Sequence, residues 1–304
     1  MSDRIHDVII IGGSYAGLSA ALQLARARRT ILIIDEGLRR NRFASHSHGF
    51  LTQDGADPAA IAEAARAQVL KYPTVEWRPA RAESARKLEV AAGSDAAFEV
   101  MVGGEKHLAR RLLLATGVRD IMPDIDGLEA RWGKAVFHCP YCHGYELNQG
   151  QIGVIAGSAL SMHHALMLPD WGPTTFLIND AFEPDEEQLS SLQARGVAVE
   201  RSPIRSITGH AEANLADGRT LSFAGLFALA RFRVASAITE GLDLDYEELP
   251  FGTIIKTGQM KETSVPGVFA CGDAGQPMAS VALGVGDGAL AGAGVHRSLM
   301  FGAV

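Results

Sequence analysis

Two cysteines separated by two residues lie near the middle of the chain, in the segment Phe137-His138-Cys139-Pro140-Tyr141-Cys142-His143. Cysteines at this spacing can close a disulfide across a short loop, and a nearby imidazolium or helix N-terminus favours the reactive thiolate. The pair therefore predicts thiol–disulfide redox chemistry. The spacing alone leaves two alternatives open, which are half of a zinc site with His143 as a third ligand and an inert buried pair. Zinc usually takes four ligands and the chain has no second Cys-x-x-Cys, so we expect no metal site.

A glycine-rich turn close to the N-terminus has the residue types of a phosphate-binding loop. The β-branched run Asp7–Ile11 predicts a buried strand, and Gly12-Gly13-Ser14-Tyr15-Ala16-Gly17 follows it directly. The alanine-rich segment Leu18–Ala25 predicts a helix, and a second apolar run, Thr30–Ile34, ends at Asp35. This order of strand, turn, helix, strand and acid is typical of a Rossmann unit and predicts a bound dinucleotide.

The positions of this turn have separate physical roles. Gly12 makes the tight turn, residue 14 lets backbone N–H groups approach a pyrophosphate, and Gly17 lets the helix close on the strand. Asp35 is placed to accept a hydrogen bond from a ribose hydroxyl. Ser14 stands where the usual pattern has its second glycine, and its side chain is small enough to be tolerated there.

The elements that follow predict an α/β domain with one long loop. Residues 39–55, RRNRFASHSHGFLTQDG, predict a loop over a ligand, and its histidines, His46 and His48, have no partners at metal-ligand spacing. We expect a helix over residues 58–71 and strands around residues 75–77, 88–91, 98–102 and 109–114, the last of which ends at the turn Ala115-Thr116-Gly117.

Taken together, these motifs resemble a known family. The nucleotide unit, the Ala-Thr-Gly turn, the Cys-x-x-Cys and the late segment Thr263–Asp273 (TSVPGVFACGD) occur in the order seen in thioredoxin reductases, and the resemblance covers almost the whole chain. It implies an α/β fold of two Rossmann-like, three-layer dinucleotide-binding domains, the second inserted in the first. Residues 1–117 and 238–304 would form the FAD-binding domain, and residues 118–237 an inserted NAD(P)H-like domain that carries the redox pair.

The same resemblance assigns the residues of an FAD site. In this family the acid of the late Gly-Asp pair, here Asp273, holds the ribityl chain, and a helix that starts near Ser280-Val281 directs its N-terminus at the flavin. The glycines of that helix at positions 284, 286 and 288 are expected to allow close backbone packing. The expected FAD-contacting residues are Gly12, Gly13, Ser14, Ala16, Gly17, Asp35, Asn41, His48, Thr116, Gly117, Gly272, Asp273, Ser280 and Val281.

The family also has a second glycine-rich turn, for a nicotinamide nucleotide, and here that turn is degraded. The strand predicted at Gln151–Ile155 is followed by Ala156-Gly157-Ser158-Ala159-Leu160-Ser161. Alanine and two serines therefore occupy the three positions where the family has glycine or alanine.

Acidic residues follow the next predicted strand, Thr174–Ile178. This strand leads into Asn179-Asp180 and an acidic segment at residues 183–187, where thioredoxin reductases place arginines for the NADPH 2′-phosphate. Carboxylates would repel that phosphate. Three possibilities stay open: NADPH held by Arg201 or Arg205, NADH with Asp180 on its ribose, and loss of nicotinamide binding.

The residues around the cysteines resemble one offshoot of the family. His143 follows the pair where thioredoxin reductases carry an acid, and Cys-x-x-Cys-His-Gly-aromatic-Glu, with the segment Ser47–Gly55, is similar to dithiol oxidases of epidithio natural-product pathways. In those oxidases a dithiol passes electrons through the cysteines to FAD, and O₂ reoxidises the flavin. By this resemblance Cys142 faces the flavin and Cys139 meets the substrate. An ordinary imidazole pKa of about 6.5 suits His143, or else His138, to take the substrate proton.

Three functions are compatible with this resemblance. The degraded second turn favours a dithiol oxidase, and the alternatives are an NAD(P)H-dependent reductase of thioredoxin or of a small disulfide and a non-catalytic, flavin-binding redox sensor. The substrate would be a dithiol or disulfide, carried by a small molecule or by a thioredoxin-like protein. The family is commonly homodimeric, so we expect a homodimer.

Composition limits the other classes of function. With 304 residues, 47% of them hydrophobic, the chain is long enough for about two domains. A net charge of −7 and the lack of a dense Lys/Arg cluster argue against a nucleic-acid partner. Three cysteines suit a reducing compartment, and the apolar run Val8–Ile11 is too short for a signal sequence or a membrane span. We therefore expect a soluble, cytoplasmic protein without a membrane partner.

Overall fold

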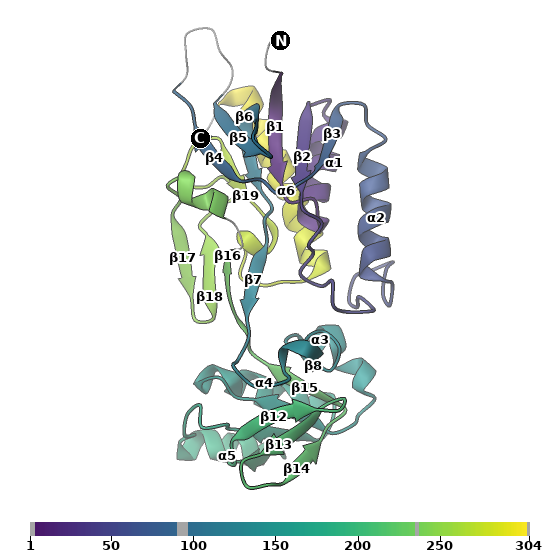
Figure 1. Cartoon of the computed structure of the whole chain (residues 1–304), viewed down its shortest axis with the longest axis vertical. Coiled ribbons are helices and arrows are strands. Elements are labelled where there is room, and N and C mark those ends of the chain that lie inside the picture. Colours follow the sequence, from purple (N-terminus) through teal and green to yellow (C-terminus); the bar gives the residue numbers. More distant parts are fainter. Residues whose placement is uncertain (1–3, 90–96, 235–236, 303–304) are drawn as a thin grey trace.

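The elements of the chain form two α/β bodies that lie one above the other along the longest axis (Figure 1). The computed structural model describes residues 4–89, 97–234 and 237–302. The upper body in Figure 1 is built from the first and last parts of the chain, and the lower body from its middle part. The α/β class with an inserted second unit, expected from the sequence, is confirmed.

A seven-stranded sheet forms the centre of the upper body. Its strand order is β3-β2-β1-β6-β5-β4, and β19 also pairs with β6. The strands β1, β2, β3, β6 and β19 are parallel, whereas β4, β5 and β6 form antiparallel pairs. The bounds are β1 Ile5–Ile11, β2 Ile31–Asp35, β3 Val75–Pro79, β4 Ser84–Lys87, β5 Phe98–Val102, β6 Glu105–Leu114 and β19 Val268–Ala270.

Both faces of this sheet are covered, which explains the unbroken apolar runs of its central strands. Successive residues of β1 enter opposite cores: Val8 and Ile10 join one buried cluster, and Ile9 and Ile11 join the other. The helices α1 (Tyr15–Arg26) and α6 (Val281–Phe301) pack against each other on the first of these cores, and α2 (Pro58–Val69) packs beside α1.

Only one of the three glycines near the start of α6 packs closely. A Cβ added at Gly288 would overlap the Ala16 carbonyl of α1, so glycine is needed where the two helices meet. The expectation of close packing is wrong for Gly284 and Gly286, because an added Cβ has no neighbour within 4 Å at either position.

The lower body also contains a covered parallel sheet. Five parallel strands have the order β11-β10-β9-β15-β8, and a separate antiparallel sheet has the order β12-β13-β14. Neighbouring residues of β15 enter different cores, Leu226 on one face and Phe227 on the other, so this sheet is also the middle of three layers. The bounds are β8 Val136–Phe137, α3 Pro140–His143, β9 Ile152–Ile155, α4 Met162–Met167, β10 Thr174–Leu177, α5 Glu186–Ala194, β11 Ala198–Glu200, β12 Ile204–Thr208, β13 Glu212–Leu215, β14 Thr220–Ser222 and β15 Gly225–Ala228.

Two strands carry the chain between the bodies. The first is β7 (Val118–Ile121) and the second is β16 (Arg231–Val234), and they pair antiparallel so that Asp120 lies opposite Phe232. Both belong to a four-stranded sheet with β17 (Tyr246–Leu249) and β18 (Gly252–Ile255). We call β7 and β16 the connector strands. The domain boundaries at residues 117 and 238 stay a prediction.

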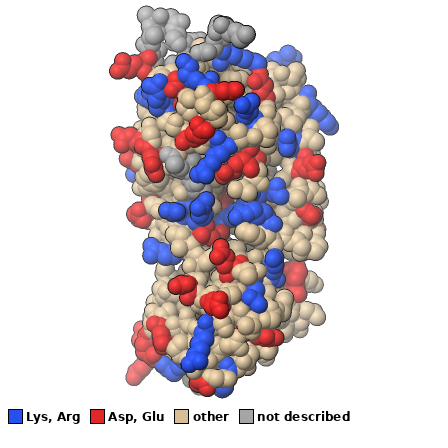
Figure 2. All heavy atoms as spheres, in the orientation of Figure 1, with Lys and Arg blue, Asp and Glu red and all other residues tan. Residues whose placement is uncertain are grey.

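Most expected elements lie within a few residues of their predicted positions. One expected strand is wrong, because the strand before β5 is β4, Ser84–Lys87, and Leu88 lies outside it; residues 90 and 91 of the expected strand lie outside the described residues. No helix in the described part of the chain is both long and apolar enough to cross a lipid bilayer. Lys and Arg are interspersed with Asp and Glu on the face shown in Figure 2.

Candidate functional site

A cavity of about 300 Å³ is lined by residues of both bodies and brings the two predicted sites together. Its wall includes the disulfide segment of the lower body and the glycine turn of the upper body. Among the residues expected to contact FAD, Gly13 and Gly17 do not line it. The residues that do are Gly12, Ser14, Ala16, Asp35, Asn41, His48, Thr116, Gly117, Gly272, Asp273, Ser280 and Val281.

The first glycine turn requires glycine for steric reasons. Gly12 has a φ of +102°, and an added Cβ would overlap the Ala115 carbonyl. A Cβ at Gly17 would overlap the carbonyl of Gly12. The N–H of Gly13 donates to Oδ1 of Asp35 at 3.0 Å, which ties the turn to the end of β2. Gly13 and Gly17 therefore shape the turn from behind the cavity.

The N-terminus of α1 is open at this cavity. Ser14 is its N-cap residue and makes no side-chain hydrogen bond to the first turn of the helix. The first N–H groups of a helix have no partner within the helix, and they carry the positive end of its dipole. Because Ser14, Tyr15 and Ala16 all line the cavity, this end of α1 is suited to a phosphate group.

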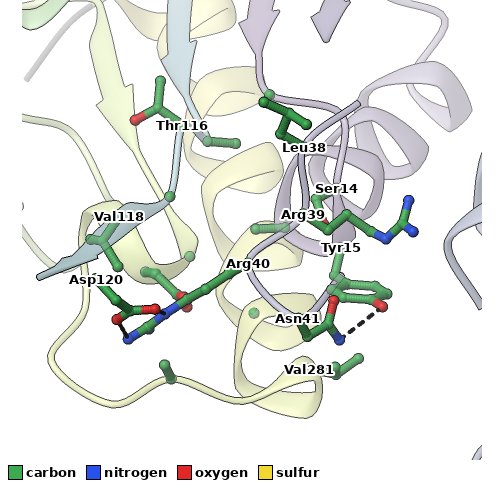
Figure 3. A pocket seen from close by; sticks show the side chains of 18 of the residues that line it. Ser14, Tyr15, Leu38, Arg39, Arg40, Asn41, Thr116, Val118, Asp120 and Val281 are labelled. Atoms are coloured by element: carbon green, nitrogen blue, oxygen red, sulfur yellow. Dashed lines mark hydrogen bonds and ion pairs between the residues drawn. The ribbon is translucent and has the colours of Figure 1, made fainter. Parts of the chain in front are cut away.

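Three buried polar atoms in the cavity wall have no hydrogen-bond partner in the described part of the chain: Oγ1 of Thr116, Oδ1 of Asn41 and Nε of Arg39. Figure 3 shows all three side chains, with Asn41 donating through Nδ2 to the Tyr15 hydroxyl at 3.2 Å. Unpaired buried polar atoms are costly unless a ligand satisfies them. Together with the open helix end, these atoms fit a polar dinucleotide such as FAD.

Arg40, which the sequence did not single out, lies across one end of the cavity (Figure 3). Its guanidinium donates to both carboxylate oxygens of Asp120 and, over 2.9 Å, to Oδ2 of Asp273. Burial alone lowers the pKa of Arg40, but its hydrogen bonds to Asp120 and the charge of Asp273 together raise it above the usual range. The side chain therefore stays charged, and Asp273 is paired before any ligand is considered.

The later half of the expected site is formed by a short 3-10 helix at Gly272–Ala274 and by the start of α6. Helix α6 begins at Val281, as predicted, and the Ser280 hydroxyl caps it by accepting the N–H of Leu283 at 3.1 Å. The N–H of Gly272 donates to Oδ2 of Asp287 at 2.8 Å. The backbone next to Asp273 is thus anchored from within α6.

Cys139 and Cys142 form a disulfide, as the redox interpretation predicts, with their Cα atoms 5.3 Å apart. Cys139 is the N-cap residue of α3, and both cysteines line the cavity. α3 lies on the side of the lower body that faces the upper body (Figure 1). The disulfide is therefore placed to exchange electrons with a group held in the cavity.

The two histidines beside the disulfide differ from expectation in their pKa. Burial is the largest cause that lowers the pKa of His143 to about 4, and the charge of His48 lowers it further. Burial, followed by the charge of Arg40, lowers the pKa of His138 to about 4. The assumed value near 6.5 is therefore wrong for both. His143 stacks on Phe137 with ring centroids 4.3 Å apart, and its neutral ring can accept a proton but holds it weakly.

His48 is less solvated than a typical loop histidine. Its side chain is only 18% exposed, and Nδ1 lies 3.5 Å from carboxylate oxygens of both Asp54 and Glu146. Glu146 belongs to the 3-10 helix Tyr145–Leu147 of the lower body, so this contact joins the long loop to the redox segment. His46 is exposed.

The second glycine turn bonds its own N–H groups. The N–H of Gly157 donates to Oγ of Ser161 at 3.0 Å, and the N–H of Leu160 donates to Oγ of Ser158 at 3.3 Å. The N–H of Ser161 also donates to the Ser158 carbonyl. The serines that degrade the motif thus occupy donors that a phosphate would need.

The acidic region beyond β10 is also engaged within the protein. Arg201, one candidate for an NADPH phosphate, forms an ion pair with Glu183. The side-chain oxygen Oδ1 of Asn179 accepts the N–H of Ile204 at 2.8 Å. At this edge of the sheet, a phosphate would therefore have to compete with Glu183 for the guanidinium of Arg201.

Comparisons with known proteins identify the family of the chain. The model of the pyridine nucleotide-disulphide oxidoreductase family matches residues 6–288. The chain is 32% identical to thioredoxin reductase sirT of Leptosphaeria maculans, over 96% of this chain and 94% of that protein. A solved oxidoreductase from Agrobacterium tumefaciens has a TM-score of 0.94 and 56% identity, with 98% of this chain and 99% of that chain covered.

A second solved structure, of the protein HlmI, has a TM-score of 0.88 and 33% identity, with 97% of this chain and 93% of that chain covered. The matches span both bodies, and the disulfide and the glycine turn lie within the matched region. The chain therefore belongs to the pyridine nucleotide-disulphide oxidoreductase family, as a thioredoxin reductase-like, FAD-dependent oxidoreductase of disulfides and dithiols.

Proposed function

We propose that this oxidoreductase works as a dithiol oxidase, which takes electrons from an external dithiol and does not depend on a nicotinamide nucleotide. One observation carries the proposal: the Cys139–Cys142 disulfide lines the same cavity as the open N-terminus of α1. A substrate dithiol, the disulfide and a flavin can therefore interact in this single arrangement of the two bodies.

FAD would be held by residues that line or shape the cavity. Asp35 would accept from its ribose, the start of α1 would hold its pyrophosphate, and Asp273 would lie at its ribityl chain. The unpaired atoms of Thr116 and Asn41 would gain partners. When bound, FAD supplies the chemistry that carries the electron pair from the enzyme dithiol to O₂.

The cysteines would oxidise the substrate by two thiol–disulfide exchanges. A substrate thiolate attacks Sγ of Cys139, the Cys139–Cys142 bond breaks, and Cys142 leaves as a thiolate. The second substrate thiolate then attacks the substrate sulfur of the mixed disulfide and releases Cys139. The substrate gains one disulfide bond, and the enzyme holds the two electrons as a dithiol. A neutral His143 ring would accept a substrate thiol proton.

The closed second glycine turn supports the oxidase over a nicotinamide-driven reductase. The donors of Gly157, Leu160 and Ser161 are already bonded, and Arg201 is paired with Glu183. Binding a dinucleotide there would require breaking these bonds first. The second candidate is an NAD(P)H-dependent reductase, which is favoured by the similarity to relatives named as reductases, such as thioredoxin reductase sirT.

An anaerobic titration of the purified flavoprotein tests the proposal. We expect a dithiol such as dithiothreitol to bleach the flavin absorbance at stoichiometric amounts, and admission of air to restore it. NADPH and NADH are expected to leave the absorbance unchanged over the same period. Fast bleaching by either nucleotide would contradict the oxidase and establish the reductase.

Cysteine variants control this experiment. Cys139→Ser and Cys142→Ser should each retain the flavin and lose bleaching by the dithiol, because neither can complete both exchanges. If Cys139→Ser bleached at the wild-type rate, the dithiol would reduce the flavin directly and the exchange mechanism would be wrong.

The same proposal includes a cytoplasmic homodimer. Three cysteines, of which Cys271 is free and buried, suit a reducing compartment. The outer side of α6 exposes apolar side chains, including Leu283, Leu290 and Met300, which a second copy could cover.

A further inference from the structure

Arg40 joins three segments that are far apart in the sequence. It comes from the loop between β2 and α2, and its guanidinium contacts Asp120 of β7 and Asp273 beside the start of α6. The same guanidinium lies 5.8 Å from the ring centroid of Phe232 in β16. Arg40 thus contacts both connector strands and the segment expected to hold the flavin. Figure 3 shows its two hydrogen bonds to Asp120.

The connector strands decide how the disulfide is oriented. The chain crosses between the bodies through β7 and β16, and their pairing puts Asp120 opposite Phe232 at the crossing. A rotation of the lower body would twist these strands, and it would move the Cys139–Cys142 disulfide away from the glycine turn. Whatever fixes the strands therefore fixes the disulfide on the cavity wall.

Two contacts that join the bodies directly are weaker in physical terms than the contacts of Arg40. The His48–Glu146 contact is 3.5 Å long, involves a carboxylate that is 40% exposed, and carries charge only when the imidazole is protonated. A Cβ added at Gly133 would lie 2.9 Å from Cβ of Phe43, which is a packing contact alone. The Arg40–Asp120 pair is doubly hydrogen-bonded, and its side chains are only 21% and 9% exposed.

We infer that Arg40 is a positioning residue that locks both connector strands to the segment around Asp273, and thereby holds the Cys139–Cys142 disulfide on the wall of the cavity. This inference does not depend on the direction of the reaction. Lysine would replace Arg40 poorly, because a single ammonium cannot bond both oxygens of Asp120 and the carboxylate of Asp273 in the same planar geometry.

Hydrogen–deuterium exchange of the purified protein tests the lock, with peptides that cover β7, β16 and, as an internal reference, β1. In Arg40→Met we expect the amides of β7 and β16 to exchange about tenfold faster, the factor expected for losing charge-assisted hydrogen bonds. The amides of β1 should stay within about twofold of the wild-type rates. Arg40→Lys should give intermediate rates in the connector strands.

Arg110→Met is the matched control, because Arg110 forms a 2.9 Å ion pair with Asp7 in the upper body and both side chains are partly buried. It should leave β7 and β16 unchanged. If Arg40→Met folds poorly, the nearly isosteric Asp120→Asn carries the test and should also speed exchange in both strands. Wild-type rates in β7 and β16, or an equal acceleration in β1, would overturn the inference.

Discussion

The first glycine turn, residues 12–17, and the second, residues 156–161, each follow a buried parallel strand and precede a helix. The first opens onto the cavity, because its N-cap residue Ser14 leaves the first turn of a twelve-residue helix without a side-chain bond. In the second, Ser158 and Ser161 accept the turn's own N–H groups, and the helix that follows has only six residues. The same local pattern therefore gives an open turn in one body and a closed turn in the other.

The difference between the turns teaches that a glycine-rich turn predicts phosphate binding only when the backbone N–H groups at the start of its helix are not already hydrogen-bonded within the protein. A strand, turn and helix pack a helix against a sheet, and they can also bind a phosphate. In the lower body the helix still packs against the sheet, but the N–H donors of the turn bond to serine side chains and backbone within the turn. The first two predictions below test this contrast between an open and a closed turn, and the third concerns a histidine in the body that contains the closed turn.

The largest effect is expected from matched alanine substitutions in the two turns. In Gly17→Ala the new Cβ would overlap the carbonyl of Gly12, whereas in Gly157→Ala its nearest neighbour is 4.0 Å away. Gly17→Ala should lose about 3 kcal/mol of unfolding free energy and most of its flavin. Gly157→Ala should lose less than about 0.5 kcal/mol and should keep all of its flavin. Urea unfolding and the ratio of flavin to protein absorbance measure both. Equal losses in the two variants would refute the contrast.

A smaller effect is expected from the serines of the two turns. Ser161→Ala removes the acceptor of the Gly157 N–H and should cost about 1–2 kcal/mol of unfolding free energy. Ser14→Ala removes a hydroxyl that makes no cap bond, and should cost less than about 0.5 kcal/mol. Denaturant midpoints of both variants check the ranking, and the reverse ranking would show that the second turn is not held closed by Ser161.

The smallest effect concerns the pH dependence of the body with the closed turn, where His143 has a pKa of about 4 because of burial. This value lies below the unfolded value of about 6.5, so the unfolded state binds the proton first, and stability present above pH 6.5 is lost as the pH falls toward 4. His143→Gln should reduce the loss of unfolding free energy between pH 7 and pH 5 by about 1–2 kcal/mol.

Urea unfolding at the two pH values measures this change, and His46→Gln is its control because that side chain is exposed. An unchanged pH dependence in His143→Gln would mean that the ring of His143 is protonated as easily in the folded protein as in the unfolded chain.

The sequence predicted those features that depend on local pattern. The strand–turn–helix unit around Gly12 and the redox pair can be recognised because periodicity and spacing act over a few residues, whereas the start of α6 near Ser280-Val281 was expected from the family resemblance. The same local reasoning misplaced the strand before β5, where no strong alternation marks the bounds.

Features that depend on tertiary contacts could not be predicted in this way. Arg40 stands among other arginines in a loop, and only the folded chain shows that this one meets Asp120 and Asp273. The pKa of His143 depends on its burial against Phe137, and the need for glycine at 288 depends on a helix some 270 positions earlier. Sequence identifies the residue types in these cases, but not their partners.

The order of the strands also sets an order of assembly. The parallel sheet of the lower body is complete once residue 228 has been made, because all of its strands lie between Val136 and Ala228. The sheet of the upper body needs β19 at Val268–Ala270, and α1 needs α6, whose Gly288 packs on Ala16. During synthesis the inserted body can therefore fold before the upper body is complete, and one apolar side of α1 stays uncovered until α6 has been made. The upper body, which contains the N-terminal strands, is thus completed after the inserted body.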